Sequence, residues 1–328
     1  MKWLSSSPAF ALSATLIGVT MIPLATFWGF NLCGKHGRDQ AQPLRLTRIF
    51  LHMAFPIYLL AIATAIISPV TAIVRLKDTD VRMVDLNWQA GWIGFWGWAV
   101  SSLLATAASV LASHAIYLAG LSVWYLVLAK QKWWKAVQLD TIIATVLLIV
   151  LDIAWFGKTI ADAFDINADR IRLEWLLVVI DLTLCLVAAL NVGIAIYCAT
   201  KLKRRGDLVT GNLSGLFLAA SLLWLLRCAF VLAVDLKTVI PDWTRDESDA
   251  QKIINPILDY WVSATVLGLV TFMVRNRVWS DPSVFADKGH WQQQQMYVQP
   301  VSQYPQPQYG QQQQPEVRRK AHQDYEQQ

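Results

Sequence analysis

Charged residues are scarce in this chain: Asp, Glu, Lys and Arg make up 16% of its 328 residues, whereas hydrophobic residues make up 55%. Between Asp85 and Lys130 the sequence has no charged residue at all. A soluble domain of this length normally carries more charge, so the composition excludes an ordinary soluble protein. It favours a chain whose apolar segments cross a lipid bilayer.

Residues for common catalytic and cofactor chemistry are also few. Only His52 and His114 lie in apolar segments, which is too few for the three-histidine zinc site of a seven-helix hydrolase. The last apolar segment, residues 253–274, has no lysine for the Schiff base of a retinal protein. No P-loop, glycine-rich dinucleotide turn or Ser-His arrangement stands out. We therefore expect no metal, no cofactor and no enzymatic activity.

The four cysteines offer no disulfide for an outer loop, because three lie inside apolar segments and Cys33 ends the first one. The formal net charge is +5, but the basic residues stand beside apolar segments. Retention of basic loops in the cytoplasm and contact with anionic lipids explain this placement better than nucleic-acid binding.

Seven segments are long and apolar enough to cross a bilayer, which needs about 20 residues. They cover residues 8–32, 49–74, 101–129, 139–157, 173–200, 213–236 and 253–274. Basic residues follow the first, third, fifth and seventh segments, so the positive-inside tendency places the amino terminus outside and the carboxyl terminus in the cytoplasm. The predicted fold is an all-α integral membrane protein, a bundle of seven transmembrane helices.

The uncharged stretch before Lys130 is the hardest to interpret, since it is too long for one span and barely long enough for two. Two spans would place the lysines after it on the side opposite the other basic loops. We therefore expect one span at residues 101–129, preceded by an outer interfacial or partly inserted helix at residues 88–98. Its tryptophans, spaced four apart, serve either as an aromatic belt or as an aromatic ligand platform.

Arg227, at the centre of the sixth span, is the most unusual residue of the membrane segments, because a charge at that depth requires a partner. The candidate partners are three acids in other spans: Asp152, Asp181 and Asp259. At 1.5 Å per residue, these four groups lie about 9–15 Å from the outer ends of their spans. His114 falls in the same outer half. The cluster is either a structural network that holds the helices in register or the lining of an outward-facing ligand site. In both cases we predict that Arg227 pairs with Asp181 or Asp259.

Two cytoplasmic features are predicted. A basic patch follows the fifth span and is suited to anionic lipids. It consists of Lys201, Lys203, Arg204 and Arg205. The tail at residues 281–328 is rich in Gln, Pro and Tyr, contains two polyglutamine runs, and is predicted to be disordered and available to a cytosolic adaptor.

Arg227 is followed by an aromatic residue, Phe230, three positions on, and Asp259 lies early in the seventh span. In these features the chain resembles fungal seven-transmembrane proteins of the lipid-translocating exporter-like and receptor-like kind. Val231 and Val234 stand where the family pattern has a second basic residue and a Glu. The resemblance covers about 50 residues, in the sixth and seventh spans, and implies a surface or endomembrane protein connected with lipid asymmetry, stress or sensing.

Three functions remain open from the sequence. A receptor-like or sensor protein without enzymatic activity is the first, a transporter or lipid-translocation factor the second, and a non-catalytic membrane organiser the third. Transport requires a polar path that continues inward from Arg227 past Asn191. A receptor requires that the basic loop and the tail recruit cytosolic proteins, and an organiser requires neither. The expected location is the plasma membrane or an endomembrane.

Overall fold

The computed structural model describes residues 3–33, 42–77, 84–128, 134–164, 171–205, 208–239, 249–276 and 279. Within these ranges the chain is helical and forms no strand. The predicted disordered tail at residues 281–328 lies outside the described residues.

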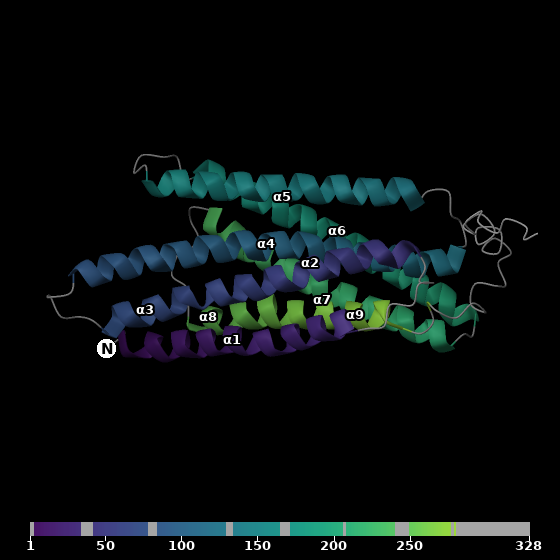
Figure 1. Cartoon of the computed structure of the whole chain (residues 1–328), viewed down its shortest axis with the longest axis horizontal. Coiled ribbons are helices and arrows are strands. Elements are labelled where there is room, and N and C mark those ends of the chain that lie inside the picture. The colour runs from purple at the N-terminus through teal and green to yellow at the C-terminus, as the bar shows by residue number, and fades with distance from the viewer. Residues whose placement is uncertain are drawn as a thin grey trace, which may run out of the picture. The chain divides into compact units, whose positions relative to one another are not determined.

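The described part forms long helices that run side by side (Figure 1). The helices are α1 (Trp3–Cys33), α2 (Gln42–Ala65), α3 (Ile67–Lys77), α4 (Val84–Leu128), α5 (Trp134–Phe164), α6 (Ile171–Arg205), α7 (Leu208–Val239), α8 (Asp249–Pro256), the π-helix η2 (Ile257–Trp261) and α9 (Val262–Val274). Seven stretches of them are long and apolar enough to cross a membrane. This confirms the predicted all-α architecture with seven candidate spans and makes the chain a multi-pass membrane protein.

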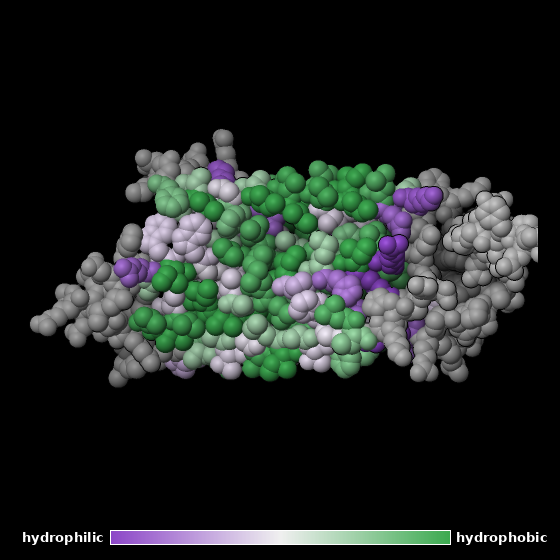
Figure 2. All heavy atoms as spheres, in the orientation of Figure 1, coloured by the Kyte–Doolittle hydropathy of each residue, from purple (hydrophilic) through white to green (hydrophobic). Residues whose placement is uncertain are grey.

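The seven spans alternate in direction, so their ends gather at two opposite ends of the bundle (Figure 1). At one end of the bundle α1, α4, α6 and α8 begin and α3, α5 and α7 finish, and we call it the N end. We call the opposite end the C end. Apolar side chains cover most of the described surface between the two ends in the view of Figure 2. Among all exposed large apolar side chains, those of α5 include Leu139, Ile142, Ile143, Val146, Leu147, Val150 and Ile153. Such a face is stable in lipid, where apolar side chains carry no solvation penalty.

Helix α4 is the centre of the bundle. It packs against α2, α3, α5, α6, α7 and α9. In its apolar window 61% of the residues are buried, against 50% in the last span and at most 33% in the others. The apolar residues of α4 are distributed around the whole helix, because most of its circumference contacts protein rather than lipid.

The expected separate helix at residues 88–98 is instead part of α4, whose apolar window runs from Gln89 to Trp124. At 1.5 Å per residue, α4 is about 68 Å long, so it extends beyond a hydrocarbon core of about 30 Å. Small residues hold its first turns against α3. A Cβ on Gly94 would approach Thr71, and one on Gly97 would approach Ile67, within 3 Å. Glycine at these two positions therefore allows close contact between α4 and α3.

Proline sets the shape of the second span. Pro56 lies inside α2, but the helix is interrupted at Ile66, three residues before Pro69. Pro69 has no amide hydrogen to donate to the carbonyl of Ala65, and its ring disfavours the preceding turn. The α2–α3 break therefore follows from Pro69, and it leaves space inside the bundle near the N end.

A second irregularity occurs in the last span, where α8 passes into the π-helix η2 before α9. Pro256 ends α8 and cannot donate a hydrogen bond to the preceding turn. The five residues that follow wind with the wider π repeat, which often marks a functional site. This turn carries both Asp259 and Tyr260 into the bundle.

Candidate ligand-binding site

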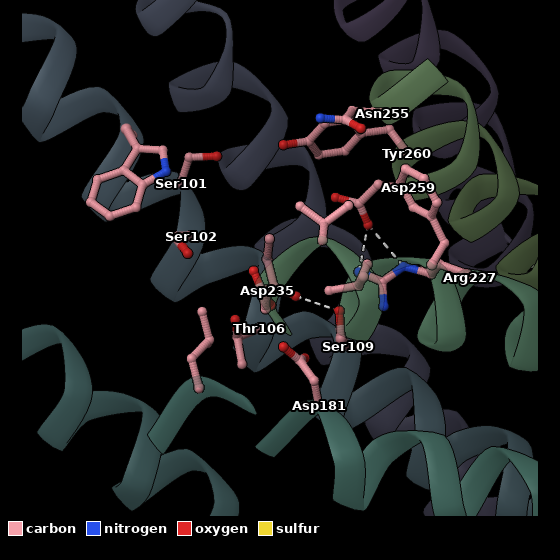
Figure 3. Close-up of a pocket in the computed structure, with 16 residues that line it drawn as sticks. Ser101, Ser102, Thr106, Ser109, Asp181, Arg227, Asp235, Asn255, Asp259 and Tyr260 are labelled. Atoms are coloured by element: carbon pink, nitrogen blue, oxygen red, sulfur yellow. Dashed lines mark hydrogen bonds and ion pairs between the residues drawn. The ribbon is translucent and has the colours of Figure 1, made fainter. Parts of the chain in front are cut away.

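Arg227 forms an ion pair with Asp259 across α7 and η2 (Figure 3). Its Nη2 lies 2.6 Å from Asp259 Oδ1, and its Nε donates a hydrogen bond to the same oxygen at 2.9 Å. The guanidinium also lies 4.8 Å from the centre of the Trp224 ring, a cation–π contact. Both interactions offset the cost of burying the guanidinium charge, because the Arg227 side chain is only 5% exposed. Asp259 is one of the two acids that the sequence named as partner.

The ion pair borders a cavity of about 210 Å³ near the N end of the bundle. Its polar lining comes from α4, α6, α7, α8 and η2 (Figure 3). These polar residues are Ser101, Ser102, Thr106, Ser109, Asp181, Arg227, Asp235, Asn255, Asp259 and Tyr260. The volume suffices for several water molecules or for a small polar ligand.

Two further carboxyl groups face this cavity, those of Asp181 on α6 and Asp235 on α7. They are close enough to share a hydrogen bond. A hydrogen bond between carboxyl groups needs one proton, because two carboxylates at that separation repel each other. Asp181 is 6% exposed, and its Oδ2 has no hydrogen-bond partner. The cavity thus contains a buried carboxyl oxygen that is available to a water molecule or a ligand.

Below the cavity, toward the C end, hydrogen-bonded side chains close the bundle. The hydroxyl of Tyr58 is 2.9 Å from that of Ser109 and 3.2 Å from that of Ser263. The Trp224 indole N–H donates to the hydroxyl of Ser113 at 2.8 Å. Tyr58 and Trp224 are fully buried. These contacts give the cavity a floor directly beneath Arg227.

Two of the predicted cluster residues do not line this cavity. The carboxyl oxygens of Asp152 are buried without a hydrogen-bond partner, so Asp152 is not a partner of Arg227. The Nδ1–H of His114 donates a hydrogen bond to the carbonyl of Val110 at 2.8 Å, and the His114 ring stacks on Phe50 with 6.3 Å between the ring centres. Residue number predicts only how deep Asp152 and His114 lie along their helices. Residues of equal depth can still face different parts of the bundle.

Of the predicted basic patch, the structure describes only the side chain of Lys201, because those of Lys203, Arg204 and Arg205 lie outside the described side chains. Its ammonium lies 5.8 Å from the centre of the Tyr197 ring.

Replacing Asp152 by leucine is expected to raise the unfolding temperature in detergent. A buried carboxyl group without partners costs about 1–3 kcal/mol, and leucine removes that cost at similar volume. The measurement is thermal unfolding of the purified variant beside the parent. A clear fall in unfolding temperature would show that the carboxyl group has a stabilising partner.

The sequence did not identify Asp235, Asn255 or Tyr260 as residues of the site. Asp235 stands at the end of an apolar segment, where a carboxylate is usually solvated, although it follows Arg227 by about two helical turns. The π-helix that turns Tyr260 inward has no reliable sequence pattern, and Pro256 is its only signal.

Comparison of the chain with protein-family models, with curated proteins and with solved structures gives no match.

Proposed function

We propose that this membrane protein is a receptor-like sensor whose N-end cavity binds a small ligand that carries an ammonium group. The proposal is supported above all by Asp181, whose buried Oδ2 faces the cavity without a hydrogen-bond partner. An ammonium group offers three donors to such an acceptor.

The charge of the cavity favours a cation. Arg227 and Asp259 neutralise each other, which leaves the carboxyl groups of Asp181 and Asp235 as the remaining acidic groups of the lining. A cationic ligand is attracted by ionisation of either carboxyl group, whereas an anion is repelled by it. In the part of the chain that the structure describes, no group of three or more His, Cys, Asp and Glu residues forms a metal site, which favours an organic cation.

The floor of the cavity supports a receptor rather than a transporter. Transport needs a polar path past Asn191, which lies on α6 ten residues beyond Asp181, or about 15 Å farther from the N end. Asn191 is fully buried, and the cavity lining does not include it. The hydrogen-bonded floor at Tyr58 and Trp224 lies just below the ion pair. A closed floor fits a ligand that binds and leaves from one side.

The basic flanks favour an orientation with the N end of the bundle outside, in which the cavity faces the exterior or the lumen of an endomembrane. In this orientation Trp98, which lines the cavity and is 48% exposed, lies near the outer interface, where tryptophan is common. The cytoplasmic side then presents the basic patch and the tail to anionic lipids and adaptor proteins.

Small amines are expected to raise the unfolding temperature of the purified protein, whereas alcohols of the same size are not. A ligand at 100 times its Kd stabilises by about 2.7 kcal/mol. Replacing Asp181 by asparagine removes the carboxyl group that is proposed to bind the ammonium and is expected to weaken amine binding by about 1.5–3 kcal/mol, or roughly ten- to a hundredfold. The measurement is thermal unfolding across a concentration series of ethanolamine and ethylene glycol.

Asp140→Asn is the matched control, because Asp140 is an exposed acid on α5 outside the cavity. It should bind amines like the parent. Equal stabilisation by amines and alcohols, or equal loss of binding in both variants, would contradict the proposed site.

A further inference from the structure

A second cavity, of about 280 Å³, adjoins the first. Five residues line both: Trp98, Ser101, Asn255, Asp259 and Tyr260. At their boundary the hydroxyl groups of Ser101 and Tyr260 point toward each other (Figure 3). The two cavities therefore adjoin at these shared side chains.

The second cavity differs in charge from the first. Its lining includes Lys252, Ser13 and Ser68, none of which lines the first cavity. The ammonium of Lys252 lies 4.4 Å from the centre of the Phe10 ring, which belongs to the same lining. An ammonium and two hydroxyl groups are donors that suit an anionic group.

The space for this cavity comes from the α2–α3 break. Ala65, Ser68 and Pro69, which surround the interruption at Ile66, all line it. The interruption of the second span therefore borders the second cavity. Both irregular turns of the bundle, this break and the π-helix η2, border the same pair of cavities.

The side chain of Asn255 can interact with ligand groups in both cavities. It lines both cavities, and its buried Oδ1 has no hydrogen-bond partner. An amide side chain can accept from an ammonium through its oxygen and donate to an anion through its nitrogen. It is suited to a ligand in which the two groups are a few bonds apart.

We infer that the two cavities form one site for a zwitterion, with its ammonium group at Asp181 and Asp235 and its carboxylate or phosphate group at Lys252. This inference rests on the proposed function for the ammonium half and adds the anionic half. The same chemistry occurs in a free amino acid or aminoalkyl phosphate and in the headgroup of an aminophospholipid.

The test compares ethanolamine with phosphoethanolamine on the full-length protein in phosphatidylcholine nanodiscs, by calorimetric titration. Phosphoethanolamine is expected to bind the parent about tenfold more tightly, because a charge-assisted contact to Lys252 is added. Lys252→Gln is expected to remove this advantage and to leave ethanolamine binding unchanged. A second set of nanodiscs containing phosphatidylethanolamine distinguishes the sources: a lipid headgroup in the site weakens phosphoethanolamine binding, whereas a site for soluble ligands does not respond.

Lys237→Gln is the matched control, since Lys237 contacts Gln251 at 3.2 Å at the same end of the bundle and lines neither cavity. It should retain the tenfold preference. If ethanolamine binds but phosphoethanolamine binds no better, or if Lys252→Gln keeps the preference, the second compartment is not part of the site and the proposed function stands. If neither compound binds the parent, the proposed function fails together with this inference.

Discussion

Replacing Arg227 by leucine is expected to lower the free energy of unfolding in detergent by about 3 kcal/mol, the lower end of the cost of removing one member of a buried ion pair. The lower end applies because the Asp259 side chain keeps 23% exposure to the cavity. The variant leaves the Asp259 carboxylate without its two hydrogen bonds from the guanidinium. Thermal and denaturant unfolding of the purified variant measure the loss.

A second replacement identifies the partner. Arg227→Leu combined with Asp259→Asn should recover most of the lost stability, because no uncompensated carboxylate remains. Arg227→Leu combined with Asp152→Asn is the control. It should not recover the stability lost in Arg227→Leu, since Asp152 has no contact with the guanidinium. Equal recovery in both double variants, or a stable Arg227→Leu variant, is incompatible with the ion pair described above.

Gly120→Ala is the second substitution with a large expected effect. A Cβ at Gly120 in α4 would overlap the end of the Phe217 ring on α7 and lie 2.8 and 2.9 Å from two further ring carbons. Phe217 is fully buried, so its ring has little room to move. Overpacking of this kind costs about 1–3 kcal/mol, and we expect a corresponding loss of stability in thermal unfolding.

Gly193→Ala is the control, because a Cβ at Gly193 would meet nothing within 4 Å. It should be neutral or stabilise α6 by up to about 1 kcal/mol, the helix propensity difference between glycine and alanine. Gly120→Ala should cost much less when Phe217 is already leucine. A Gly120→Ala variant as stable as Gly193→Ala would mean that α4 and α7 do not pack as described.

The general fold was accessible from the sequence because spanning helices must satisfy their backbone hydrogen bonds within a single apolar segment. Segment length and charge placement therefore predicted seven spans, and Arg227 pairs with one of the two acids named for it. The start of the third span was predicted too late. Residues 88–98 continue α4, because glycines at positions 94 and 97 let the helix pack on α3 instead of ending in the interface.

The candidate site was only partly accessible. Depth along a helix follows from residue number, but the face that a residue presents depends on how the helices pack. Asp152 has a depth similar to that of Asp181, yet only Asp181 lines the cavity. The π-helix at Ile257–Trp261 changes the directions in which the side chains of the last span point. As a result, the neighbouring residues Asp259 and Tyr260 both line the cavity.

The central claim, an acidic cavity open at the N end of the bundle and facing outward, is tested most directly by thiol labelling of Ser102→Cys. Ser102 lines the first cavity only (Figure 3). The four native cysteines are first replaced by alanine, and membrane-impermeant cationic and anionic thiosulfonates are then applied to intact cells. We predict labelling from outside, about tenfold faster with the cationic reagent, and loss of this preference in Asp181→Asn. Equal rates for the two reagents, a faster anionic reagent, or labelling only after permeabilisation would contradict the claim.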